Sequence, residues 1–354
     1  AGGRSFKAIV FGEEAGAFSI GGEETLGVTD AITNLSAQVQ SVTVPCTVGI
    51  VGLPFEFACT GGDLSFADVS STVPAETLVK SGEGQLVLPD TLLRAAKNMT
   101  VRAGLLKTTY TTRVTAATPQ DGALTIEAGG MLDVDRDLGN GAYITRMEPF
   151  HGKTIYIAGD GDGRGALYNS YPSVNWGTAF GRVVLTDDAS VGGTHLSVRP
   201  LSGSRIPGAT IEGPYTFTVK TIRYDPTVTD RVFSFTTTTF ALDRLNVTGF
   251  ALLEGVQAGV ITNGVHLYDG GGLHFFGATV SNGCANVVTE TGTSVINCLS
   301  ASTMSSDFLV TSDTVLNVDI GKNLTVNGAV TVEGTLSKTA GAGVMLLGGT
   351  VKGT

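Results

Sequence analysis

Charged side chains are scarce in this sequence, and those present form no basic surface. Charged residues make up 15% of the 354 residues, against about 25% in an average soluble domain. The 22 Lys and Arg are scattered, without a basic run, and are outnumbered by 32 Asp and Glu. A net charge of −10 is the opposite of what a nucleic-acid-binding face requires. We therefore expect no nucleic-acid partner.

Long apolar runs are also missing. A membrane-spanning helix needs about 18 or more consecutive apolar residues. The most apolar segment, residues 250–265, is interrupted by Glu254, Gln257 and Asn263. The sequence predicts no membrane span.

Signatures of catalysis and of zinc binding are absent from the sequence. The four histidines are dispersed along the chain, and no G-x-S-x-G elbow or CxxC pair occurs. A cluster of histidines, or either of these motifs, would indicate a catalytic or zinc-binding site. We expect a protein that is not an enzyme and has no resident cofactor.

Cysteine occurs only four times, as two local pairs. Cys46 and Cys59 are 13 residues apart, and Cys284 and Cys298 are 14 apart. Such separations could set partners on adjoining turns of a repeating fold, where disulfides would form in an oxidising compartment. The alternative is four buried free thiols.

Glycine and short alternating apolar segments are abundant. The 49 glycines are about twice the usual share, and apolar segments recur every 8 to 12 residues in the first 70 positions, too closely for βαβ units. No linker interrupts the chain. These features predict an all-β protein of stacked strands, with residues 1–354 as one body.

One segment occurs twice. LVKSGEGQLVL (Leu78–Leu88) returns as LSKTAGAGVMLL (Leu336–Leu347), with one extra residue, Ala340. Each copy has an alternating strand, a Lys two places after its first Leu, a glycine corner and a second strand. Self-similarity of this kind indicates a solenoid.

The segments after the first copy suggest the length of one coil. NMTVRAGLLKT (residues 98–108) and GALTIEAGGMLDV (residues 122–134) share a strand, a corner and a strand, offset by about 25 residues. Between the first copy and them, residues 89–98 predict one short helix with Asp90 at its N-cap. We divide the chain into N-terminal strands (1–77), regular repeats (78–138), a loop-rich insertion (139–200) and C-terminal coils (201–354).

Residues 78–134 and 323–347 resemble the passenger-associated (autotransporter-associated) β-strand repeat, whose pattern runs L-x-K-x-G-x-G-x-L-x-L, then A-G-x-L, then L-x-V-x-x-G-G-x-L-D-V. The resemblance implies an exported, right-handed parallel β-helix displayed outside the cell, in adhesive or structural roles. At about 25 residues per coil, an elongated β-solenoid of about 12–15 coils is expected.

Three carboxylates alternate in LDVDRDLGN. Asp133, Asp135 and Asp137 would share one face of a continuing strand, and Ca²⁺ is the cation that such oxygen ligands hold. The alternative interpretation is a solvated acidic edge relieved by Arg136 and Arg146.

A second group of residues suggests a carbohydrate site. Tyr168, Tyr171 and Trp176 offer rings on which sugars could stack, and Asp187 with Asp188 resembles the acid pairs of β-helix polysaccharide hydrolases. A loop corner explains Asp187 and Asp188 more simply. A carbohydrate-active enzyme or tailspike-like glycan-binding protein is therefore the alternative hypothesis.

The two ends of the chain lack polar caps, which favours pairing of one end with the other. We expect head-to-tail stacking of copies of the chain into an extracellular filament or surface layer, with adhesion to cell-surface or matrix polysaccharide as a compatible role. The start AGGRSF fits a mature terminus left by signal-peptide removal. The residues expected at the contact are Phe6, Ile9, Phe11, Val344, Leu346 and Val351.

Overall fold

The computed structural model describes residues 4–67, 72–109, 122–134, 152–170, 178–194, 196–200, 208–221, 233–339 and 343–353. They belong to two compact units, Ala1–Tyr171 (unit 1) and Pro172–Thr354 (unit 2). Each unit is described by itself.

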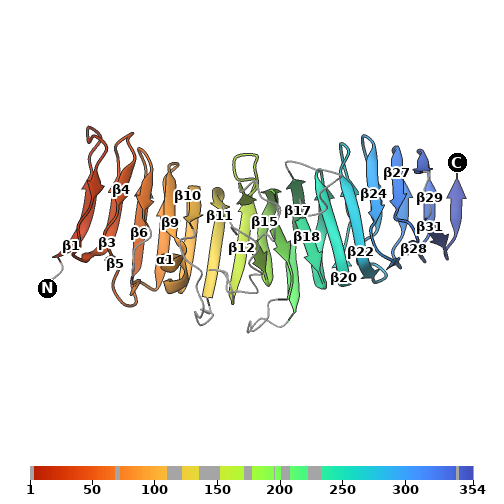
Figure 1. Ribbon diagram of the computed structural model, residues 1–354, viewed down its shortest axis with the longest axis horizontal. Coiled ribbons are helices and arrows are strands. Elements are labelled where there is room, and N and C mark those ends of the chain that lie inside the picture. Colours follow the sequence, from red (N-terminus) through yellow and green to blue (C-terminus); the bar gives the residue numbers. More distant parts are fainter. Residues whose placement is uncertain are drawn as a thin grey trace. The chain divides into compact units, whose positions relative to one another are not determined.

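Unit 1 is a stack of parallel strands, each hydrogen-bonded to the strand one turn later (Figure 1). Residues with period-two alternation form these strands because one face can then be buried while the other stays exposed. The strands are β1 (Arg4–Phe11), β2 (Ser19–Ile20), β3 (Leu26–Asn34), β4 (Gln40–Val42), β5 (Cys46–Val48), β6 (Pro54–Cys59), β7 (Leu64–Phe66), β8 (Thr77–Ser81), β9 (Gln85–Pro89), β10 (Asn98–Thr109), β11 (Gly122–Asp133), β12 (Lys153–Gly159) and β13 (Leu167–Asn169).

Side chains in register form rows through the core of unit 1. One row, which we call the lysine row, lies on the strands before the glycine corner and runs Ile9, Ile32, Phe57, Lys80, Val101. A second row, on the strands after the corner, runs Ile20, Val42, Phe66. The solenoid thus repeats the same position once per turn.

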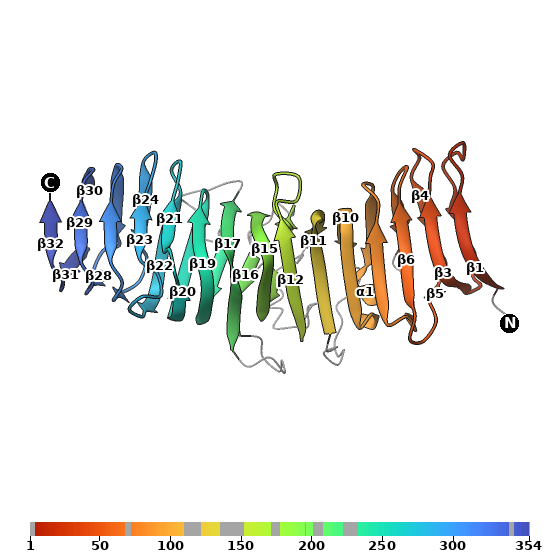
Figure 2. The ribbon, with the colours of Figure 1, turned by 180° about the vertical axis from the view of Figure 1, so that it is seen from behind.

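Unit 2 is built in the same way, and Figure 2 shows its later turns from behind. Ile296, for example, pairs with Leu316, which pairs with Lys338. Its strands are β14 (Thr178–Phe180), β15 (Arg182–Gly193), β16 (Leu196–Val198), β17 (Ala209–Thr221), β18 (Phe233–Thr236), β19 (Thr238–Val247), β20 (Phe250–Ile261), β21 (Val265–Leu267), β22 (Gly272–Val280), β23 (Val287–Thr289), β24 (Ser294–Cys298), β25 (Ser302–Met304), β26 (Phe308–Val310), β27 (Thr314–Val318), β28 (Asn323–Val326), β29 (Val330–Val332), β30 (Leu336–Lys338), β31 (Val344–Leu347) and β32 (Val351–Gly353).

Clusters of phenylalanine rings fill part of the core in each unit. In unit 1 the ring of Phe57 packs edge-on against Phe55 and Phe66, with centroids 5.0 and 5.3 Å away. In unit 2 Phe235 packs in the same way against Phe233 and Phe240, at 4.9 and 5.1 Å. Each buried ring contributes roughly 1.5–3 kcal/mol.

The glycine corners allow one turn to approach the next. Gly82 has φ = 75°, and a Cβ there would lie 2.4 Å from the carbonyl oxygen of Cys59 on the preceding turn. Any other residue would be strained in its backbone and would also push the two turns apart. The glycine of the repeated segment is therefore required by the stacking itself.

The helix expected at residues 89–98 is present and short. α1 spans Asp90–Ala95, with Pro89 rather than Asp90 at its N-cap. Its C-terminal end is closed from another turn, because Lys153 Nζ donates to the carbonyls of Ala96 and Lys97 at 2.7 and 3.0 Å. In the described part of the chain no helix has the length and apolar character needed to cross a membrane.

The β-solenoid prediction is confirmed: the chain is nearly all β, with parallel strands stacked in about 12 turns. The segment 139–200, for which loops were expected, carries the strands β12 to β16 among its described residues.

Candidate functional site

The first strand of unit 1 leaves core positions uncovered. Within the described residues β1 pairs with β3 alone. Phe6, in register with the buried Val28, is 45% exposed, and Ile9, which begins the lysine row, is half-buried. Phe11 is buried and stacks on the exposed Phe18, with ring centroids 6.5 Å apart. We call β1 and β2, with the corner between them, the N-terminal edge.

The last strands of unit 2 leave core positions uncovered in the same way. β30, β31 and β32 each pair, among the described residues, with the strand of the preceding turn only. Leu347 and Val351 are in register with the buried Val326 and Val330 but are 45% and 54% exposed. We call β30, β31 and β32 the C-terminal edge.

Two residues expected at the contact face outward instead. Val344 and Leu346 are in register with Asn323 and Thr325, whose side chains lie on the outer face of β28. The core-facing residues of β31 are Met345 and Leu347. The run VMLL is apolar on both faces, so sequence alternation could not distinguish them.

The lysine of the repeated segment is a core residue in unit 1. Lys80 is fully buried, and its Nζ donates to the carbonyl of Gly82 and to those of Ser81 and Ala103, at 3.3 and 2.7 Å. Ala103 belongs to the next turn. Burial lowers the pKa of Lys80, and the charges of Cys59, Glu83 and Asp63 act against that shift.

The equivalent lysine in unit 2 lies at the C-terminal edge. Lys338 is in register with the buried Leu316, so it occupies a core position, yet it is exposed. Its Nζ donates to the carbonyl of Thr339 at 3.3 Å. Ala340, the extra residue of this copy, lies outside the described residues.

A ladder of polar side chains leads to this edge through unit 2. Thr339 donates its hydroxyl to Asn317 Oδ1, Asn317 Nδ2 donates to Asn297 Oδ1 at 2.8 Å, and Asn297 Nδ2 lies 3.0 Å from His274 Nε2. Because the amide donates, His274 Nε2 accepts and the ring is neutral. Burial lowers the pKa of His274 to about 4. The only signal for this ladder in the sequence is the spacing of its polar residues, about one turn apart.

Of the three expected calcium ligands, only Asp133 lies within the described residues. Asp133 is buried and accepts a hydrogen bond from the backbone N–H of Ser170 at 3.0 Å, a structural role. Asp135 and Asp137 lie outside the described residues. No group of three His, Cys, Asp or Glu that could hold a metal ion occurs in the part of the chain that the structure describes.

The two acids of the carbohydrate hypothesis bind backbone. Asp187 Oδ1 accepts from the N–H of Asp188, and Asp188 Oδ1 accepts from the N–H of Thr216 on the next turn, both at 2.8 Å. Both carboxylates therefore accept backbone hydrogen bonds, Asp187 within β15 and Asp188 from the neighbouring β17. This is the structural role expected of acids at a corner.

Of the three aromatic residues in the carbohydrate hypothesis, only Tyr168 lies within the described residues. Tyr168 is half-buried, and the guanidinium of Arg164 lies 5.7 Å from its ring centroid. Burial raises the pKa of Tyr168, as does the charge of Asp133 beside it. Tyr171 and Trp176 lie outside the described residues.

The predicted disulfide Cys46–Cys59 is not formed, and both cysteines are buried. Cys46 pairs with Leu26 and Cys59 with Asn34, the two ends of β3. An extended strand of that length spans about 26 Å, whereas a disulfide needs Cα atoms within about 7 Å. Burial raises the pKa of the Cys59 thiol to about 11.

The predicted disulfide Cys284–Cys298 is not formed either. Cys298 is in register with Phe275 on β22, while Cys284 follows the end of that strand. The Cys284 thiol donates to the carbonyl of Ala258 at 3.3 Å, and the Cys298 thiol donates to that of Ser300 at 3.1 Å. Burial raises the pKa of Cys284 to about 12.

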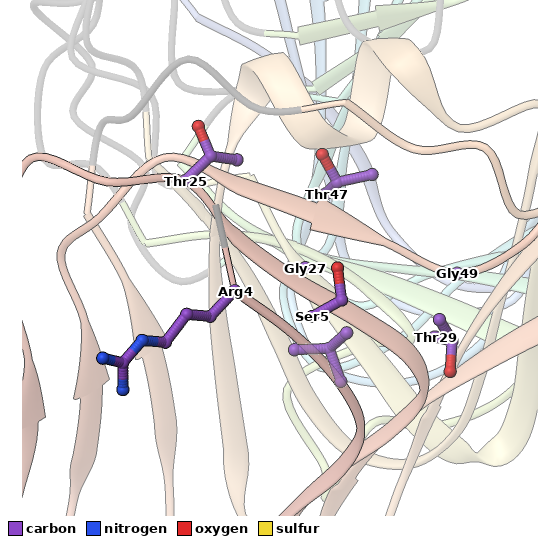
Figure 3. Close-up of a pocket in the computed structure, with 8 residues that line it drawn as sticks. Arg4, Ser5, Thr25, Gly27, Thr29, Thr47 and Gly49 are labelled. Carbon is purple, nitrogen blue, oxygen red and sulfur yellow. The ribbon is translucent and has the colours of Figure 1, made fainter. Parts of the chain in front are cut away.

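A hollow of about 360 Å³ lies on the outer face of β1, β3 and β5 in unit 1 (Figure 3). It exists because Gly27 lacks a side chain between Ser5 and Thr47, its in-register neighbours. The surrounding side chains are the hydroxyls of one serine and three threonines, with Arg4 and Val28. No acid lines it, and no pair of its side chains forms an acid–base set.

The geometry therefore offers two open strand edges rather than a catalytic centre in the described residues. Both edges expose apolar side chains from core positions. Comparison with known protein families, curated proteins and solved structures gives no match for this chain.

Proposed function

We propose that the protein is a structural subunit that assembles end to end, with the N-terminal edge of one copy stacked on the C-terminal edge of the next. The observation that carries the proposal is the exposure of core-facing residues at both edges: Phe6 at one, and Leu347 and Val351 at the other. An adjoining turn, before β1 or after β31 and β32, would bury them, as turns on both sides bury core-facing residues in the interior of each unit.

The direction of the strands supports a chain of copies rather than a closed pair. All strand pairings described within each unit are parallel, so the N-terminal edge of unit 1 and the C-terminal edge of unit 2 are different surfaces. Neither can pair with a copy of itself in the same parallel arrangement. A contact between two different surfaces continues indefinitely unless it closes into a ring. Unpaired backbone at each edge adds hydrogen bonds to the apolar contact.

Electron microscopy of the 354-residue protein at several concentrations tests the proposal. We expect filaments whose amount rises with concentration. Leu347→Asp should abolish them, or raise the concentration at which they appear at least tenfold, because a carboxylate would be buried at the contact. Val256→Asp is the matched control, since Val256 is equally exposed but lies on β20, away from both edges.

Single particles at every concentration, or equal filament formation by both variants, would contradict the proposal. The glycan-binding hypothesis would then be tested next, with polysaccharide-binding and cleavage screens. An extracellular location and a polysaccharide partner stay predictions.

A further inference from the structure

The repeated segment specifies how two copies would fit together. Resting on the end-to-end assembly proposed above, we infer that the N-terminal edge of a second copy covers Lys338 as β10 covers Lys80. In this register Ile9 of the second copy stacks on Lys338, its Phe18 on Met345 and its Ile20 on Leu347.

The first step of the argument is the covered copy. Lys80 pairs with Phe57 on the preceding turn and Val101 on the following one. The following turn also supplies the Ala103 carbonyl, 2.7 Å from Lys80 Nζ. A buried ammonium of this kind is stable only when carbonyls surround it. Burial of the lysine at this position of the repeat therefore depends on a turn on each side.

The second step is the uncovered copy. Lys338 occupies the same position of the repeat and faces the core over Leu316, yet no described turn follows it and its side chain is exposed. Met345 and Leu347, the counterparts of the fully buried Leu86 and Leu88, are partly exposed. The C-terminal edge therefore has the lysine and the preceding turn of the arrangement seen around Lys80, but no described turn that follows.

The third step is that the N-terminal edge has the residues that such a following turn would supply. Ile9 is the first member of the lysine row and, like Val101, is a β-branched apolar residue. Ile20 begins the row that runs on to Val42 and Phe66. The strands that bear Ile9 and Ile20, β1 and β2, follow each other along the chain, as β30 and β31 do.

Charge favours the same occupant. Glu13 and Glu14 are exposed in the corner that follows β1, and in the inferred register, with Ile9 on Lys338, this corner lies just past the end of β30. Around Lys80 the acids Glu83 and Asp63 have the corresponding effect, favouring the charged lysine against the cost of burial. A second copy thus brings an apolar row to the core positions of the C-terminal edge and an acidic corner to the neighbourhood of Lys338.

Cysteine cross-linking tests the register. The inference places Ser337 beside Ala8 of the second copy, both exposed and on the outer face. Neighbouring strands lie about 4.8 Å apart, within the range of a disulfide. We expect Ser337→Cys and Ala8→Cys proteins, mixed and oxidised, to form a covalent dimer that neither forms alone. The native thiols are buried and should not interfere.

The control replaces Ala8→Cys with Val10→Cys, which lies on the same face two residues further along β1. Its Cα would be about 8 Å from that of residue 337, so dimer yield should fall at least fivefold. Electron microscopy of the same mixtures separates the possible failures. Filaments without the Ser337–Ala8 dimer, or with more dimer from Val10, would overturn the register and leave end-to-end assembly standing. Absence of both filaments and dimer would overturn the two proposals together.

Discussion

The two copies of one sequence segment occupy opposite environments. Leu78–Leu88 lies inside unit 1, where Lys80, Leu86 and Leu88 are fully buried between two turns. Leu336–Leu347 forms the C-terminal edge of unit 2, where the equivalent Lys338 and Leu347 are exposed. The segment alone therefore does not specify whether its lysine and leucines are buried. The turn that follows it decides whether the lysine is a core residue or a surface residue.

The copies also differ in what holds the residue after the lysine. Ser81 donates its hydroxyl to Glu56 Oε1 at 2.6 Å on the turn before, while Thr339 donates to Asn317 and so joins the ladder to His274. The covered copy is held by turns on both sides. The edge copy is anchored from one side only, by that ladder and by its strand pairing.

The largest expected effect separates the copies by apolar burial. Leu88→Ala should lower the free energy of unfolding by about 4 kcal/mol, because it leaves a cavity between packed turns. Leu347→Ala in the unassembled protein should cost about 1 kcal/mol, since its side chain is 45% exposed. Urea unfolding of the two variants at low protein concentration measures both. Equal losses would contradict the difference in environment.

The next effect depends on pH and concerns the ladder that anchors the edge copy. His274 has a pKa of about 4 in the folded protein, against 6.5 for an exposed histidine in the unfolded chain, so the unfolded chain binds more protons between these two pH values. Stability is complete above pH 6.5 and falls as the pH drops, by about 3 kcal/mol at pH 4. His274→Asn keeps an acceptor for Asn297 but cannot titrate.

Urea unfolding at pH 7, 6, 5 and 4 checks this prediction. The difference in unfolding free energy between the wild type and His274→Asn should change steadily between pH 6.5 and 4, in favour of the variant at low pH. A difference that does not change with pH would show that His274 titrates normally.

The smallest of the three effects compares the two lysines. Lys80→Met keeps most of the apolar volume but removes the donor to three carbonyls, and should cost about 2 kcal/mol. Lys338→Met should leave the stability of the unassembled protein unchanged within error, because the side chain is exposed. Thermal unfolding of both variants gives the comparison. A loss for Lys338→Met as large as that for Lys80→Met would mean that a turn already covers the edge.

Much of the fold could be predicted because it depends on local patterns. Alternating apolar residues predicted the strands, and the glycine corners of the repeated segment predicted the solenoid. The segment 139–200 was harder to predict, since β12 and β15 are separated by long stretches without alternation. The core-facing residues of β31 were missed because VMLL is apolar on both faces.

The candidate site depended on distances that spacing does not give. Cys46 and Cys59 are near in sequence, but they pair with opposite ends of β3. Asp187 and Asp188 have a composition that suits acid catalysis, but backbone N–H groups bind both carboxylates. Residues on one turn are separated by the width of that turn, so closeness in sequence is a poor guide to contact in a solenoid.

The length of one repeat, the alternation of apolar residues and the glycine corners can be read from the sequence, because they follow from strand geometry and from the backbone freedom of glycine. The tertiary structure is needed to show which copy of the repeat is buried, that the cysteines of each local pair are not joined, and which polar side chains form the ladder through His274. Those outcomes depend on register between turns. Register is set by how whole rows of side chains pack against one another, and no single segment contains that information.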